Sequence, residues 1–268
     1  QATPKQVTHL LGEDSLFQIA VRRLDGVFPP ERILVVTTEE LFTVLHHQCP
    51  EIPAGNFLLE PQPKGTASVV GLAASVLQKI APQAVMAILT ADHFIENIPL
   101  FQRLLSAAYL AARQGQLVTL GVTPTFPATG YGYIQGGAEL GNQDGLPVLQ
   151  ALHFKEKPDL EQAHQFIASG DHTWNSGMFI WQVGDILAEF SRQMPELYHR
   201  LQILSQDWNT PQWHTALQRA WEPLPIVSID YGIMEGAERV AVIPALDLGW
   251  YDVGSWDALF NVLPQDAD

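Results

Sequence analysis

The sequence is poor in three features that would narrow the class of protein at once: cysteine, basic residues and long apolar runs. Cys49 is its single cysteine, so the chain cannot form an internal disulfide, which is compatible with a reducing cytoplasm. Its apolar runs fall short of the ~20 residues that span a bilayer, and the polar start from Gln1 to Leu10 lacks the basic-then-apolar pattern of a signal peptide. We therefore expect a cytoplasmic protein with no membrane partner.

Basic residues are outnumbered two to one, with 14 Lys and Arg against 29 Asp and Glu and a formal net charge of −15. A field of this sign repels nucleic acid and anionic membranes, so neither is expected as a partner. Any anionic ligand must be held by local positive charge. With 47% hydrophobic and 16% charged residues, the 268-residue chain is expected to fold into one or two globular domains.

Several catalytic signatures are also missing from the sequence. The nine histidines and one cysteine form no H-x-x-x-H or C-x-x-C pair, which argues against a zinc site of those spacings. The dinucleotide pattern G-x-G-x-x-G, the P-loop pattern G-x-x-x-x-G-K-[ST] and the nucleophile elbow G-x-S-x-G do not occur either.

What the sequence does contain is an alternation of helical and strand-like segments. Helical spacing of apolar residues is found at 15–24, 39–48, 67–80 and 100–113, and short apolar runs are found at 32–37, 56–60, 84–89 and 117–122. This βα alternation predicts an α/β fold of the Rossmann-like, doubly wound type, with a mainly parallel (mixed) sheet flanked by helices. Thr66 is expected to N-cap the helix at 67–80, and Lys64 and Gly65 beside that N-terminus suggest an anion site.

The stretch 84–93 joins a near-continuous apolar run to Asp92 and His93. Such a run predicts a central strand covered on both faces, and ligands of open α/β sheets collect beyond the carboxyl ends of the strands. Asp92 is thus placed to hold a metal or a polar ligand. The alternative is that Asp92 only caps the following turn, which Asn97 and Pro99 mark.

A second carboxylate, Asp252, lies in a similar setting within Leu248–Trp256. Two hard oxygen ligands, completed by water and phosphate, are the expected way to hold Mg²⁺. The sequence does not show whether Asp92 and Asp252 meet.

Two further stretches carry polar groups beside strands. Glu156 stands between Lys155 and Lys157, where an acid could accept sugar hydroxyls and a lysine could meet phosphate; a solvated strand end is the alternative. Asn175 and Gly177 interrupt an aromatic run that can serve either a flat polar ligand or the core.

Taken together and in order, the motifs of the chain resemble those of mannose-1-phosphate guanylyltransferases, also called GDP-mannose pyrophosphorylases, which are sugar nucleotidyltransferases. The motifs are Pro4-Lys5-Gln6, Glu60-Pro61 with Thr66-Ala67, Ala91-Asp92-His93, Thr129-Gly130-Tyr131-Gly132-Tyr133-Ile134, Phe154-Lys155-Glu156-Lys157-Pro158, Trp174-Asn175-Ser176-Gly177-Met178-Phe179, Ser228-Ile229-Asp230-Tyr231 and Trp250-Tyr251-Asp252-Val253-Gly254-Ser255-Trp256. The resemblance covers essentially the whole chain.

The resemblance implies a role for each of ten residues. Lys5 is expected to contact phosphate in catalysis, and Asp92 and Asp252 are expected to be catalytic ligands of Mg²⁺. The expected substrate-binding residues are Glu156 and Asn175 for the sugar, Lys157 for its phosphate, Gly130 packed against the sugar, and Glu60, Thr66 and Tyr131.

The sequence departs from the family pattern in two places. The Gly-rich signature that should precede Pro4-Lys5 is absent, so we expect about one strand and one loop upstream of a single nucleotidyltransferase domain at 1–268, and little activity from this chain alone. Lys64-Gly65-Thr66-Ala67 stands where many bacterial members carry Arg-Asn-Thr-Ala. No C-terminal β-helix or isomerase domain is expected after the Asp252 motif.

The expected reaction is the Mg²⁺-dependent, in-line attack of mannose 1-phosphate on the α-phosphorus of GTP, giving GDP-mannose and pyrophosphate. Two alternatives stay open: the same chemistry with another nucleoside triphosphate or sugar 1-phosphate, and a catalytically inactive protein that binds sugar nucleotide and regulates a partner. The oligomeric state is open as well, with a homodimer as one option.

Overall fold

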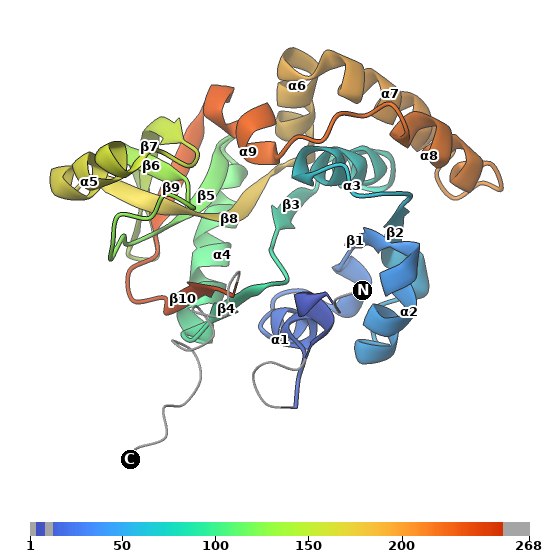
Figure 1. Cartoon of the computed structure of the whole chain (residues 1–268), viewed down its shortest axis with the longest axis horizontal. Helices are drawn as coiled ribbons and strands as arrows, with labels where there is room; N and C mark the ends of the chain where they lie inside the picture. Colours follow the sequence, from blue (N-terminus) through green and yellow to red (C-terminus); the bar gives the residue numbers. More distant parts are fainter. Residues whose placement is uncertain (1–3, 9–12, 254–268) are drawn as a thin grey trace. The chain divides into compact units, whose positions relative to one another are not determined.

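The computed structural model describes residues 4–8 and 13–253 (Figure 1). The chain divides into two compact units, and each contains segments that are distant in sequence. The first unit is made of residues 1–59, 89–103 and 247–268, and the second of residues 60–88 and 104–246. The expectation of one domain spanning 1–268 stays a prediction.

The first unit is built from short helices and two small sheets. Its elements are η1 (Lys5–Val7), α1 (Leu16–Arg22), η2 (Pro30–Arg32), β1 (Val35–Thr38), α2 (Glu39–Gln48), η3 (Ala54–Asn56), β2 (Phe57–Glu60), β4 (His93–Ile95), the start of α4 (Ile98–Ala112), and β10 (Trp250–Asp252). Ser15 and Gln18 form a capping box that starts α1. Apolar side chains of α1 and α2, among them Phe17, Val21 and Leu45, form the core of this unit.

A short antiparallel ladder of β4 and β10 joins the middle of the chain to its last described segment. His93 is directly opposite Asp252, and Ile95 is opposite Trp250. After β4, the side chain of Asn97 accepts a hydrogen bond from the backbone N–H of Leu100 at 3.1 Å. Asn97 therefore caps the start of α4.

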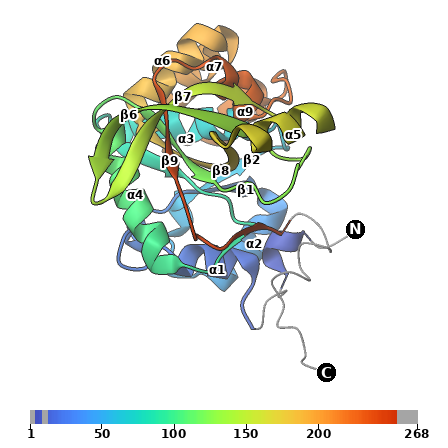
Figure 2. The same cartoon turned by 90° about the vertical axis from the view of Figure 1, so that its left-hand side faces the viewer.

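The second unit contains a six-stranded mixed sheet. Its strands are β3 (Val85–Ile88), β5 (Leu117–Val122), β6 (Tyr133–Gln143), β7 (Leu146–Lys155), β8 (His172–Gln182) and β9 (Val240–Pro244), in the order β3-β8-β5-β9-β7-β6. The pair β5 and β9 is parallel, and the other pairs of this sheet are antiparallel in the described part of the chain. The expected α/β fold with a mixed sheet flanked by helices is confirmed (Figure 2).

The prediction of a central strand at 84–89 is wrong for the part of the chain that the structure describes. There β3 lies at the end of the strand order and pairs with β8, and three of its four residues are only partly buried. An apolar run shows that a strand loses contact with water; it does not show how many strands flank it, because a helix can cover an end strand as well.

Several helical segments accompany the sheet in this unit, and one of them makes a close crossing. They are α3 (Thr66–Ile80), α5 (Leu160–Ser169), α6 (Val183–Gln193), α7 (Pro195–Gln206), α8 (Trp213–Trp221), the single-turn α9 (Ile229–Gly232) and η4 (Met234–Gly236). Helix α3 packs against α6 and α7 (Figure 1). At the crossing, a Cβ on Gly71 would be 2.6 Å from a methyl group of Leu201, so a larger residue would require Leu201 to shift. Within the described residues, we find no helix that combines the length and apolarity needed to cross a membrane.

Candidate functional site

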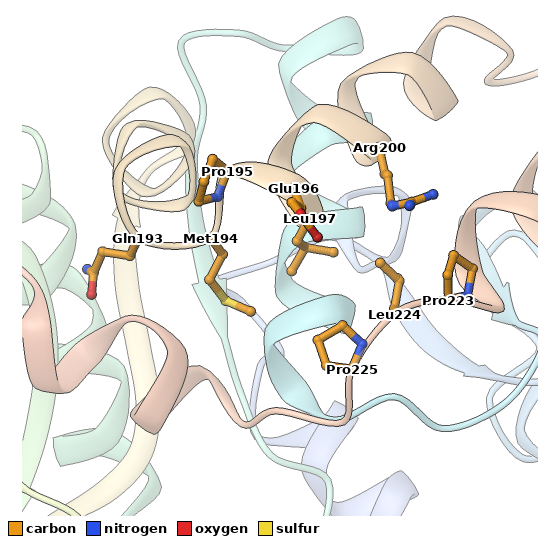
Figure 3. Close-up of a pocket in the computed structure, with 9 residues that line it drawn as sticks. All are labelled: Gln193, Met194, Pro195, Glu196, Leu197, Arg200, Pro223, Leu224 and Pro225. Atoms are coloured by element: carbon orange, nitrogen blue, oxygen red, sulfur yellow. The ribbon is translucent and has the colours of Figure 1, made fainter.

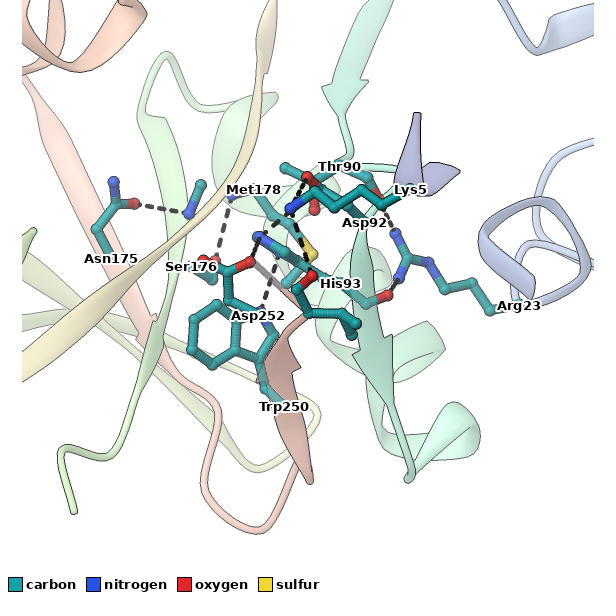
Figure 4. A network of polar contacts seen from close by, with 12 residues as sticks. Lys5, Arg23, Thr90, Asp92, His93, Asn175, Ser176, Met178, Trp250 and Asp252 are labelled. Carbon is teal, nitrogen blue, oxygen red and sulfur yellow. Dashed lines mark hydrogen bonds and ion pairs between the residues drawn. The ribbon is translucent and has the colours of Figure 1, made fainter. Parts of the chain in front are cut away.

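Asp92 and Asp252 converge in the first unit, although they come from distant parts of the sequence. Asp92 immediately precedes β4 and Asp252 ends β10, and the carboxylate of each lies near Nε2 of His93, at 3.9 Å for Asp92 and 4.0 Å for Asp252 (Figure 4). The ladder explains the meeting, because Asp252 is the direct cross-strand partner of His93. Both carboxylates stay partly exposed, at 25% and 30% of the side chain, and are thus open to a ligand.

Lys5 supplies positive charge to this pair. Its Nζ lies 3.0 Å from a carboxylate oxygen of Asp92 and donates to the backbone carbonyl of Val253 at 3.4 Å (Figure 4). The backbone N–H of Val253 in turn donates to the carbonyl of Asp92. The N-terminal lysine, Asp92 and the end of β10 are therefore held in one local network.

His93 is buried between these carboxylates. Burial lowers its pKa to about 4, although the negative charge of Asp92 acts in the opposite direction. Its Nδ1 accepts a hydrogen bond from the indole N–H of Trp250 at 3.1 Å. At neutral pH the imidazole is consequently uncharged, and the positive charge in contact with Asp92 comes from Lys5.

Arg23 fixes the loop that carries Asp92. Its guanidinium donates to the backbone carbonyl of Thr90 at 2.6 Å and to that of His93 at 2.9 Å (Figure 4). It also lies 5.3 Å from the ring centre of Phe101. Burial lowers the pKa of Arg23 to about 10, while Asp92 opposes that shift. Sequence reasoning missed this residue because an arginine in an amphipathic helix looks like a solvated side chain.

The donor chemistry of this network suits a hard divalent cation. Carboxylate oxygens are the usual ligands of Mg²⁺, with water and substrate phosphate filling the remaining positions. Within the described residues, no group of three or more His, Cys, Asp or Glu is arranged as a complete metal site. Two carboxylates with room for other oxygen ligands therefore fit Mg²⁺ better than a closed structural site such as that of zinc.

A second polar cluster, in the second unit, centres on Asn175 of β8. Its amide nitrogen donates to Asp230 at 2.8 Å, its amide oxygen accepts from the backbone N–H of Gly177 at 3.0 Å, and its own backbone N–H donates to the carbonyl of Gly132. These contacts fix the amide orientation. The residue is 9% exposed, and its amide is held in place before any ligand arrives.

Glu156 and Lys157 follow β7 beside this cluster. Glu156 is buried, and burial together with the negative charge of Asp230 raises its pKa. Lys157 lies 3.0 Å from Glu156, and this hydrogen bond raises the pKa of the lysine. The backbone of Lys157 has a positive φ of 46°, which is uncommon for a residue with a side chain. A buried acid next to a half-exposed lysine offers suitable partners for hydroxyl and phosphate groups.

Asp230 and Gly132 complete the cluster, although neither was assigned a role from the sequence. Asp230 accepts the Asn175 hydrogen bond, and burial raises its pKa. A Cβ on Gly132 would lie 2.4 Å from a carboxylate oxygen of Glu156, whereas a Cβ on Gly130 would meet nothing within 4 Å. A larger residue at Gly132 would therefore force the Glu156 carboxylate to move. Both glycines belong to the Thr-Gly-Tyr-Gly-Tyr motif, but the spacing of the motif does not show which of the two is closely packed.

Tyr131 and Glu60 are the other predicted substrate contacts in this unit. The ring of Tyr131 packs edge-on against Trp174, with 5.0 Å between the ring centres. Glu60 is buried, and burial raises its pKa. Its Oε2 has no hydrogen-bond partner in the described structure. A buried acceptor without a partner is costly unless a ligand or water satisfies it, so Glu60 is a candidate for ligand recognition.

The prediction that Thr66 N-caps α3 is wrong. Gly65 is the N-cap residue, and the hydroxyl of Thr66 accepts a hydrogen bond from the backbone N–H of Ile229 at 2.8 Å. The backbone N–H of Ala67 and the ammonium of Lys64 are also engaged, with the carbonyls of Val227 and Glu222. The predicted anion site at this helix N-terminus would have used such donors, but in the structure these groups form hydrogen bonds with residues 222–229.

A hollow of about 240 Å³ lies elsewhere in this unit, where α6 meets α7 and the chain returns after α8 (Figure 3). It is lined by Gln193, Met194, Pro195, Glu196, Leu197, Arg200, Pro223, Leu224 and Pro225. No residue that the sequence singled out lines it, so we do not take it as the candidate site.

The fold and these polar clusters belong to a chain of the nucleotidyl transferase class. A family model described as nucleotidyl transferase matches residues 1–268, and the chain belongs to this family. A mannose-1-phosphate guanylyltransferase from Klebsiella pneumoniae is 36% identical over 266 residues, which cover 98% of this chain and 56% of the relative. The chain spans about half the length of the curated relatives it matches.

Two solved structures are also similar to the chain. One, described as a mannose-1-phosphate geranyltransferase from Thermus thermophilus, has a TM-score of 0.83 and 32% identity, and the match covers 94% of this chain and 70% of that one. Another, described as a mannose-6-phosphate isomerase from Helicobacter pylori, has a TM-score of 0.76 and 26% identity, with coverage of 93% and 94%.

Proposed function

We propose that the protein forms GDP-mannose and pyrophosphate from GTP and mannose 1-phosphate. The observation that carries the proposal is the meeting of Asp92, Asp252 and Lys5 in one network within a chain of the nucleotidyl transferase family. Relatives named mannose-1-phosphate guanylyltransferase support the choice of base and sugar.

In the proposed reaction the protein positions reactants and neutralises charge. Asp92 and Asp252 would hold Mg²⁺, which when bound offsets the negative charge of the nucleotide phosphates. The ammonium of Lys5 would add positive charge beside the reacting phosphate, and the Arg23 guanidinium keeps the Asp92 loop in place. In such transfers little covalent work falls to the protein, so a general base is not required.

In the second unit, the sugar hydroxyls would form hydrogen bonds with Asn175, Glu156 and Asp230. Lys157 would meet the sugar phosphate, because its ammonium is the cation beside Glu156. Glu60 would receive the base, since the N1–H and N2–H₂ donors of guanine match the two oxygens of a carboxylate. Gly130 and Tyr131 remain proposed sugar neighbours.

The direct test uses the full gene product that contains this chain. Pyrophosphate release is measured with mannose 1-phosphate and each of GTP, ATP, UTP and TTP in the presence of Mg²⁺, and interconversion of mannose 6-phosphate and fructose 6-phosphate is measured in parallel. The proposal expects turnover with GTP in the ordinary range of ~1–10³ s⁻¹. Binding of GDP-mannose without turnover would favour the regulatory alternative, and isomerase turnover alone would refute the proposal.

The first prediction for this site concerns the sugar. Glu156→Gln and Asn175→Ala should each raise KM for mannose 1-phosphate roughly tenfold, the effect of ~1.4 kcal/mol of lost hydrogen bonding, and change GTP affinity less. Asn142→Ala is the matched control, because the Asn142 side chain serves a hairpin turn through the N–H of Gly145. Calorimetry with each substrate separates the effects; loss of nucleotide affinity with normal sugar-phosphate affinity would reverse the assignment.

The second prediction concerns the base. Glu60→Gln places an amide donor against guanine donors, so the preference for GTP over ITP, which lacks the N2 amine, should fall roughly tenfold or more. Exposed Glu161, in the first turn of α5, provides the control variant Glu161→Gln. The measurement is kcat/KM for both nucleotides. An unchanged GTP to ITP ratio in Glu60→Gln would remove Glu60 from base recognition.

A further inference from the structure

The hydrogen bond between Trp250 and His93 determines which imidazole nitrogen carries the proton. The indole Nε1–H donates to Nδ1 of His93 at 3.1 Å, and the rings meet edge to face at 81° with 5.0 Å between their centres (Figure 4). An indole N–H is only a donor, so Nδ1 must offer its lone pair. The proton of the imidazole is therefore on Nε2.

This Nε2–H group faces both candidate metal ligands. It lies 3.9 Å from Asp92 and 4.0 Å from Asp252, beyond direct hydrogen-bond distance. The strand register accounts for the arrangement: Asp252 is opposite His93, and Trp250 is two residues earlier on the same face of β10. Two side chains of β10 thus face the two different nitrogens of His93: the indole of Trp250 faces Nδ1 and the carboxylate of Asp252 faces Nε2.

The other tautomer would change the chemistry of the site. With its proton on Nδ1, His93 would present an Nε2 lone pair beside two carboxylates. One imidazole with two carboxylates favours transition metals such as Zn²⁺ and Co²⁺, whereas oxygen donors alone suit Mg²⁺. A protonated Nε2 cannot bind a metal, and it can only donate.

We propose that Trp250 is a positioning residue for metal selectivity: by holding His93 as the Nε2–H tautomer, it keeps nitrogen out of the metal coordination and preserves an oxygen-only site. The inference rests on the proposed role of Asp92 and Asp252 as Mg²⁺ ligands. His93 is then a donor toward the carboxylates or their bound water and is not itself a ligand.

The tautomer is tested without any assay of activity. Long-range ¹H–¹⁵N NMR spectra of the imidazole nitrogens distinguish Nε2–H from Nδ1–H, and the signals of His93 are assigned by their loss in His93→Gln. In the unaltered protein we expect the proton on Nε2. Detection of the Nδ1–H tautomer there would overturn the proposal without the need for a Trp250 variant.

The selectivity is tested by titration calorimetry with Mg²⁺ alone and with Co²⁺ alone. Trp250→Phe removes the indole N–H and keeps an aromatic ring. The ratio of Co²⁺ affinity to Mg²⁺ affinity should then rise roughly tenfold or more, because substituting a residue that hydrogen-bonds to a metal ligand commonly changes metal affinity by about that factor. The double variant Trp250→Phe/His93→Gln should lose that gain. Trp221→Phe is the control, because Trp221 is another buried indole whose N–H donates, in its case to the carbonyl of Gln62.

The outcomes separate this inference from the proposed function. An unchanged affinity ratio in folded Trp250→Phe, or a tenfold loss of Co²⁺ affinity in His93→Gln alone, would overturn the role of Trp250 and leave the Mg²⁺ site standing. Mg²⁺ affinity that is equal in the unaltered protein and in Asp92→Asn would overturn both.

Discussion

Asp92→Asn and Asp252→Asn are each expected to lower turnover by about 10²–10³, the loss that follows removal of one well-placed electrostatic element from an active site. Asparagine keeps the shape of the side chain and removes the charge, so the fold should persist. The reason for a large effect is that both carboxylates lie within 4.0 Å of one nitrogen, where each would contribute to holding the same cation. The measurement is turnover as a function of Mg²⁺ concentration, with thermal unfolding recorded for each variant.

The control for this pair is Asp247→Asn, in the same unit. Asp247 is exposed and has a φ of 60°, a conformation that asparagine tolerates well. Near-normal turnover is expected from it. If both Asp92→Asn and Asp252→Asn kept normal Mg²⁺-dependent turnover, the metal assignment would be lost, together with the reason for placing the reaction at this network.

Arg23→Met is expected to destabilise the protein by about 2–4 kcal/mol, because it leaves the buried carbonyls of Thr90 and His93 without their charged donor. Methionine retains much of the side-chain volume, so the loss reflects hydrogen bonds more than a cavity. For a chain of this size the melting temperature should fall by roughly 5–12 °C. Affinity for Mg²⁺ should fall too, since Arg23 fixes the loop that carries Asp92.

The neighbouring residue supplies a matched control for this prediction. Arg22 pairs with Asp14, and its side chain is 62% exposed. Arg22→Met should change stability by no more than about 0.5 kcal/mol. Equal melting temperatures for the two variants would show that burial of the Arg23 guanidinium does not stabilise this loop.

Local segments were well predicted from the sequence. The helix at 39–48 and the strand at 117–122 have the expected bounds, because their apolar periodicity and their end signals are encoded within a few neighbouring residues. The order of motifs indicated the family, and the family match confirms that interpretation. Asp92 was singled out because a charge that follows an apolar run is visible without any tertiary information.

The errors have one physical source, which is competition from distant residues. Thr66 has the chemistry of an N-cap, but the N–H of Ile229 takes its hydroxyl. The run at 84–89 has the apolarity of a central strand, but tertiary pairing places it at the end of the described sheet. In each case the local preference is worth about 1 kcal/mol or less, and a tertiary contact can override it.

The sequence by itself indicated the four helices and four strands predicted between residues 15 and 122, the family, and the residue types available for the two polar clusters. Tertiary structure decided the strand order and directions, and it decided which partners meet: Arg23 with the carbonyls of Thr90 and His93, and Trp250 with the imidazole of His93. The physical reason is that periodicity and capping depend on residues a few positions apart. The hydrogen-bond partner of a buried polar group, by contrast, can come from any part of the chain, so it is fixed only by the packing of the folded protein.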